Sequence, residues 1–125
     1  MNKSPLWLIL FVTLSAAMAG PALAECKVSG PSPMYLGSNA TYEISVTVEP
    51  QGLCPLFFSS LSSAVHFSSA DILAKPSSGK LASAGHLNFA YSAANVGHDT
   101  FSLTLCGTDT AGTGCDTLNY VVDVK

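Results

Sequence analysis

Arginine is absent from this 125-residue sequence, and charged residues of any kind make up only 10% of it. Lysine supplies all the strong positive charge, and the formal net charge at neutral pH is −3. Proteins that bind nucleic acid or anionic membrane surfaces gain much of their affinity from lysine and arginine placed against phosphates. This composition argues against both kinds of partner.

Several catalytic motifs are also missing. The sequence has no Gly-x-Ser-x-Gly, no Cys-x-x-Cys and no His-x-His. These patterns are typical of serine hydrolases, of thioredoxin-like or zinc sites, and of local metal chelates. The eight acids are scattered, and we expect most of them to lie solvated in loops or on outer strand faces. The sequence therefore predicts no catalytic residues, no cofactor and no enzymatic activity.

Histidine is the commonest metal ligand in proteins, which makes the three histidines candidates for a metal site. His66, His86 and His98 are 20 and 12 residues apart, which gives no local chelate. We expect all three to be exposed and predict no metal site. A zinc or copper site built from two of them is the alternative.

Two aspartates were considered as calcium ligands. Calcium needs several oxygen donors, and Asp99 before a strand and Asp109 in a loop do not supply them. We expect the side chain of Asp99 to cap the turn at Gly97 instead.

The only long apolar run lies near the start of the sequence, where residues 6–18 follow Lys3. Ala22-Leu23-Ala24 then provides the small residues of a cleavage site, so residues 1–24 are interpreted as a secretory signal peptide. The run is too short for a membrane span, which needs roughly 20 apolar residues. A lipoprotein is disfavoured because Glu25 rather than a small residue precedes Cys26.

Cleavage would leave residues 25–125, which have the length of a single domain. We expect this domain to lie in the periplasm or to be secreted, with no membrane insertion. All four cysteines fall within it: Cys26, Cys54, Cys106 and Cys115. An even number in a small exported chain is typical of a disulfide-bonded domain. Four cysteines allow three pairings.

The pairing is predicted from two strands, 100–106 and 115–124, in which apolar and polar residues alternate around a turn-rich loop at 107–114. If Cys106 faces Cys115, Leu103 faces Leu118 on the apolar face. A shift of one residue would place every apolar side chain opposite a polar one. We therefore predict a Cys106–Cys115 bridge, and by elimination a Cys26–Cys54 bridge. The predicted core residues of this hairpin are Phe101, Leu103, Leu105, Leu118, Tyr120 and Val122.

Similar alternation predicts strands at 42–48 and 86–91, with weaker candidates at 54–58 and 64–67. Residues 59–83 are compatible with a short helix, but short strands joined by loops are favoured. About seven short strands separated by turns predict an all-β fold, a small antiparallel two-sheet sandwich with two disulfides.

The stretch 93–101, followed by a Leu-x-Leu strand, a glycine-rich loop and a Val-x-Val strand, resembles the C-terminal half of bacterial Ig-like and cadherin-like modules. Tyr91, Gly97, Asp99 and Phe101 occupy the matching positions, and the resemblance covers roughly residues 91–124. It implies an Ig-like sandwich. The start of the predicted mature chain also resembles pilin or spore-coat-type subunits, which can open with a cysteine after the signal and pair it with another some thirty residues on. Cys26 and Cys54 fit that outline.

These observations lead to one main hypothesis: an exported, non-enzymatic module that binds an unknown protein partner or has a structural role in the bacterial envelope. The alternatives are a periplasmic protein that binds metal through its histidines, and a subunit of a pilin- or coat-like surface polymer.

Overall fold

The structure is a computed structural model that describes residues 26–30, 39–59 and 64–125. The predicted signal peptide and the residue that follows it, 1–25, lie outside the described residues. The described part is all-β and contains no helix, so it has no helix long and apolar enough to cross a membrane.

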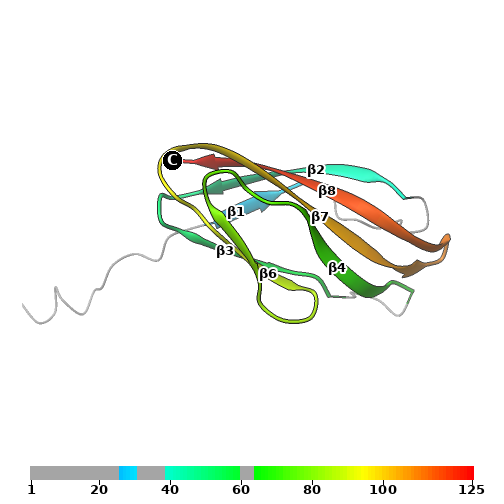
Figure 1. Cartoon of the computed structure of the whole chain (residues 1–125). Coiled ribbons are helices and arrows are strands. Elements are labelled where there is room, and N and C mark those ends of the chain that lie inside the picture. The colour runs from blue at the N-terminus through cyan, green and yellow to red at the C-terminus, as the bar shows by residue number, and fades with distance from the viewer. Residues whose placement is uncertain (1–25, 31–38, 60–63) are drawn as a thin grey trace, which may run out of the picture.

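Eight strands form two sheets. The larger sheet has the order β1-β2-β8-β7-β4, and the smaller has the order β3-β6-β5. In Figure 1, β3 and β6 lie across from β2, β7 and β8, so the sheets form two layers. The strands are β1 (Cys26–Ser29), β2 (Thr41–Val48), β3 (Leu53–Phe57), β4 (His66–Ala74), β5 (Lys80–Ser83), β6 (Asn88–Ser92), β7 (Gly97–Asp109) and β8 (Gly112–Val124).

The core lies between the sheets and is organised around a row of aromatic rings. Phe101 of β7 stacks on Tyr120 of β8, with ring centroids 4.5 Å apart, and on Tyr91 of the opposite sheet at 5.1 Å. A Cys26–Cys54 disulfide links the edge strands β1 and β3, one from each sheet. The prediction of a small all-β sandwich with two disulfides is confirmed. The buried apolar residues are Ile44, Val46, Val48, Cys54, Leu56, Phe89, Tyr91, Ala93, Phe101, Leu103, Leu105, Leu118, Tyr120, Val122 and Val124.

The β7–β8 hairpin has the predicted register and the predicted bridge. Leu103 faces Leu118, and Cys106 faces and is bonded to Cys115. The predicted loop at 107–114 is wrong in its length, because the ladder continues to Asp109 and Gly112 around a two-residue turn. Glycine residues are typical of turns and predicted the longer loop, but Gly107 and Gly114 face each other within the ladder.

The prediction of an entirely antiparallel sandwich is wrong at one place, since β2 and β8 pair in parallel. Ile44 lies beside Tyr120, and Val46 beside Val122, so both strands turn their apolar faces to the core. Alternation along a strand specifies which face is buried, but it carries no information about the direction of the neighbouring strand. The sequence therefore indicates that each of these segments is a strand, but it does not indicate that the two strands pair in parallel.

The ambiguous stretch 59–83 contains strands β4 and β5, as favoured, apart from residues 60–63, which lie outside the described part. Strand β4 pairs with β7 through two register shifts, between Phe67 and Ser69 and between Ile72 and Ala74. Such bulges interrupt the two-residue period. This interruption explains why the sequence of β4 gave only a weak strand signal.

The two faces of the hairpin should respond differently to truncation. We expect Leu103→Ala to lower the free energy of unfolding by about 3 kcal/mol, because Leu103 is fully buried and its loss leaves a cavity. Thr104→Ala, on the outer face, should change it by less than about 0.5 kcal/mol. Urea denaturation of both variants measures this, and similar losses would contradict the assignment of the faces.

Candidate functional site

The three histidines lie in three separate places. His66 begins β4, His98 belongs to β7, and His86 occupies the turn before β6 rather than the strand predicted for it. All three are exposed, as expected. Within residues 26–30, 39–59 and 64–125, no three histidine, cysteine or acidic side chains are grouped so that they could hold a metal ion.

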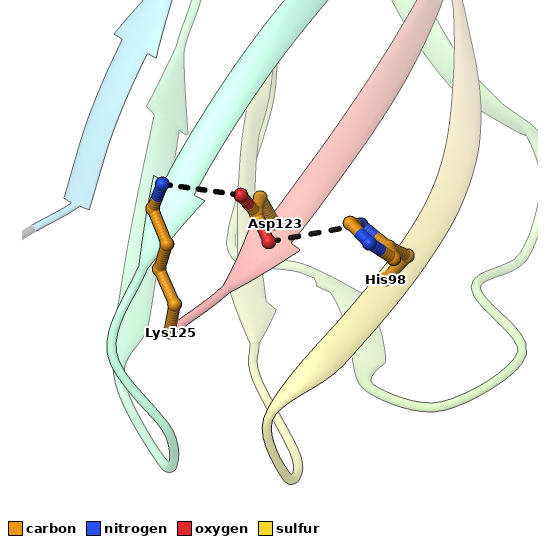
Figure 2. Close-up of polar contacts among 3 residues, drawn as sticks. All are labelled: His98, Asp123 and Lys125. Atoms are coloured by element: carbon orange, nitrogen blue, oxygen red, sulfur yellow. Dashed lines mark ion pairs between the residues drawn. The ribbon is translucent and has the colours of Figure 1, made fainter.

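One histidine takes part in a small charged cluster on the outside of the larger sheet. His98 Nδ1 lies 3.6 Å from Asp123 Oδ1, and Lys125 Nζ lies 3.4 Å from Asp123 Oδ2, as Figure 2 shows. The side chain of His98 is 83% exposed. Ion pairs in water contribute between about 0 and 1 kcal/mol. This cluster therefore has neither the burial nor the donors of a catalytic or metal site.

Asp99 differs from its prediction, because it is buried and binds a distant loop rather than the turn at Gly97. Its Oδ1 accepts hydrogen bonds from the backbone N–H of Ser77 at 2.9 Å and of Ser78 at 3.3 Å. Its Oδ2 accepts bonds of 2.8 Å from the Gly79 N–H and from the Tyr91 hydroxyl. The carboxylate therefore holds the 77–79 loop against β6 and β7.

These bonds determine the charge state of Asp99. Burial by itself would raise the pKa of Asp99, but the hydrogen bonds from Gly79, Tyr91, Ser77 and Ser78 favour the anion and lower the pKa to about 2. Burial and the hydrogen bond to the charged Asp99 carboxylate raise the pKa of Tyr91, so the Tyr91 hydroxyl stays neutral and acts as the donor. The arrangement is a satisfied internal anchor with no open position for a substrate.

Two more acids contradict the expectation of solvated carboxylates. Asp109 is 8% exposed and Asp116 is fully buried. Asp116 Oδ1 accepts a 3.0 Å bond from the Ala40 N–H, and Asp109 Oδ1 accepts a 2.8 Å bond from the Ala111 N–H. Burial raises the pKa of Asp116, the Ala40 bond opposes this, and the charge of Asp109 adds to the rise. Asp109, placed by prediction in a loop, thus stabilises the tight hairpin turn.

The most unusual surface belongs to the small sheet. Cys54, Leu56, Phe89 and Tyr91 point into the core, so the alternate residues point outward. Leu53 is 55% and Phe57 67% exposed, although both are large and apolar. We call this surface the outer face of the small sheet. Its residues are Leu53, Pro55, Phe57, Lys80, Ala82, Asn88, Ala90 and Ser92.

Apolar residues form the central row of the outer face of the small sheet. In the strand register, Pro55 on β3, Ala90 on β6 and Ala82 on β5 form one row. The large apolar side chains thus stand along β3, while β6 beside it carries Asn88, Ala90 and Ser92, and β5 beyond β6 carries Lys80 and Ala82. Lys80 is the only charged residue of this face. The sequence did not predict this surface, because residues 53–58 are apolar at both alternating sets of positions. The pattern therefore does not indicate which side of the strand is buried.

The outer face of the larger sheet is more polar, since hydroxyl, amide and charged groups occupy most of its β7–β8 rows and Val121, 40% exposed, is the large apolar side chain among them. Ser102 donates a 2.8 Å hydrogen bond to Asn119, and the hydroxyls of Thr108 and Thr113 lie 3.0 Å apart. These pairs satisfy one another across β7 and β8. Apolar side chains that are exposed together on one face often mark a contact surface, and this contrast makes the outer face of the small sheet the candidate functional site.

No protein-family model and no curated protein matches the chain. The assignment of the candidate site therefore rests on the geometry of the structure.

Proposed function

We propose that this chain is an exported, non-enzymatic β-sandwich module that binds a protein partner through the outer face of the small sheet. The observation that carries the proposal is the pair of exposed large side chains, Leu53 and Phe57, which flank the apolar row of Pro55, Ala90 and Ala82. Aromatic side chains at the centre of protein interfaces often contribute most of the binding energy. The buried acids, in contrast, each accept a hydrogen bond from the protein's own backbone.

A setting outside the cytoplasm is supported by chemistry. All four cysteines of the chain are paired in two disulfides. Disulfides persist in oxidising compartments such as the periplasm or the exterior of the cell. The predicted signal peptide at residues 1–24 fits the same setting, and we propose that the mature domain is periplasmic or secreted.

The Ig-like or cadherin-like assignment also stays a proposal. It gains support from three of the residues that carry the resemblance, because Tyr91 bonds Asp99 and stacks on Phe101. Their arrangement gives these positions a shared role in holding the two sheets together.

The sheet edges favour binding through a face over addition of a strand, which many surface polymers use. Strands β1 and β5 have four residues each and carry Lys27 and Lys80. Strand β3 contains Pro55, and β4 contains its two register shifts. Short length, lysine, proline and bulges all hinder pairing at an open edge. The polymer-subunit alternative therefore has less support.

The proposal predicts a position-specific contact in the cells that export the protein. A photo-crosslinking residue at position 57 should give one discrete adduct with an extracytoplasmic protein, and the same residue at exposed Ser45 should give none. Phe57→Asp should weaken binding to that protein by at least about tenfold. It should change the free energy of unfolding by less than about 0.5 kcal/mol, since Phe57 is exposed.

The Ser45 position is the matched control because it lies on the outer face of β2, in the larger sheet. Equal adducts from both positions, or unchanged binding by Phe57→Asp, would show that the outer face of the small sheet is not the contact surface.

A further inference from the structure

The two disulfides occupy different environments. Cys54 is 1% exposed and belongs to the core, and its bond to Cys26 joins the two sheets. Cys106 and Cys115 face each other within one hairpin, on the side turned away from the core. Cys115 is exposed and Cys106 is half-buried. Cys26 is half-buried like Cys106, so exposed Cys115 makes the second bridge the more open of the two to a reagent in solution.

The hairpin does not depend on this bridge for its shape. Strands β7 and β8 pair from Gly97 opposite Val124 to Asp109 opposite Gly112, and each has a second neighbour in the sheet. The backbone beside each sulfur is held separately, because Cys115 N–H donates to Asn39 Oδ1 at 2.9 Å and the Cys106 carbonyl accepts from Ser68 Oγ at 3.2 Å. Both bonds would persist if the sulfurs separated.

We propose that the Cys106–Cys115 bond is a thiol-exchange site, which reacts with external thiolates while Cys26–Cys54 and the fold stay intact. Exposed disulfides are in general the labile ones, and buried ones resist reduction. The surroundings admit an anionic thiolate. On this face the ladder partner of Cys106 is Ser69, the next row carries Thr104 and Thr117, and the row toward the turn carries Thr108 and Thr113. Ionisable groups enter these neighbouring rows only at the β4 edge, as Asp71 opposite Thr104 and His66 opposite Thr108.

The greater exposure of Cys115 than of Cys106 assigns the direction of the reaction. An incoming thiolate attacks Sγ of Cys115, and a new sulfur–sulfur bond forms between them. The bond to Cys106 breaks, and the electron pair leaves with Cys106 Sγ, which takes up a proton from water. A second external thiolate then attacks the mixed disulfide, giving the reduced hairpin and an oxidised thiol dimer.

Reduced glutathione is a suitable probe because its adduct has a defined mass. The full chain is incubated with it at neutral pH, quenched with acid, alkylated and mapped by mass spectrometry. We expect the adduct on the peptide that contains Cys115, with Cys26–Cys54 still bonded and the circular dichroism spectrum of the fold retained. Simultaneous loss of both bridges, prior loss of Cys26–Cys54, an adduct confined to Cys106, or no reaction would overturn the proposal.

Two variants separate reactivity from stability. Cys106→Ser removes the internal competitor, so oxidised glutathione should leave a lasting adduct on Cys115. The double variant Cys106→Ser/Cys115→Ser should remain folded at 25 °C, with a melting temperature lowered by about 10 °C. The matched double variant Cys26→Ser/Cys54→Ser should lose more, because its bridge closes a longer loop of 28 residues and joins the sheets. If the first double variant were unfolded, the exposed bridge would be structural and the proposal wrong.

Discussion

Asp99→Asn is expected to lower the free energy of unfolding by about 4 kcal/mol at neutral pH, although it changes one atom of the side chain. An amide has one acceptor oxygen, whereas the carboxylate uses both of its oxygens to accept from the 77–79 loop and from Tyr91. The new NH2 group would face a donor at 2.8 Å, leaving donors buried without partners. Urea denaturation at pH 7 measures the loss.

The control is Asp123→Asn, on the exposed carboxylate of Figure 2, which should cost less than about 1 kcal/mol. The pH dependence provides a second readout. The pKa of Asp99 is about 2 in the fold and 3.8 ordinarily, so its stabilisation is complete above about pH 5 and is lost as the pH falls through 2. The gap between wild type and Asp99→Asn should therefore narrow by about 2 kcal/mol between about pH 5 and pH 2. A constant gap would show that the charge is not the cause.

Phe101→Ala should also cost about 4 kcal/mol, because it removes the middle ring of the stack that connects the sheets. Phe101→Leu keeps most of the apolar volume and should lose about half as much. Thr100→Ala, at the adjacent exposed position, is the control and should stay within about 0.5 kcal/mol. Thermal unfolding with two-state analysis measures all three, and equal losses from Phe101→Leu and Phe101→Ala would contradict the stabilisation assigned to the apolar volume of the side chain.

The sequence was most informative where two independent signals agreed. In the β7–β8 hairpin, the phase of Phe101 and Leu103 and the phase of Cys106 each predicted the same register, and the structure confirms it. Strand β2 and the apolar face of β6 were recognised by alternation alone. The order of strands within the sheets and the parallel β2–β8 pair depend on contacts far apart in sequence, which no local pattern encodes.

The acids were predicted to be solvated because they are charged. Their positions in the alternating pattern of each strand instead indicate burial. Asp99 is in phase with Phe101, and Asp116 is in phase with Leu118, which places both on the inner face. That phase was the available signal. The donors that make burial of Asp99 tolerable come from residues 77–79, in a segment whose sequence gave no firm prediction.

The two disulfides join the first cysteine to the second and the third to the fourth. A chain that enters an oxidising space with its N-terminal end first exposes Cys26 and Cys54 before the other two. About 50 residues separate the pairs, which corresponds to several seconds at a synthesis rate of about 5–20 residues per second. During that interval Cys26 and Cys54 are the only cysteines of the chain available to pair with each other when they are oxidised. For a chain exported in this order, oxidation in the order of emergence yields the native bonds directly, so correct pairing of the four cysteines would need an oxidase but no disulfide isomerase.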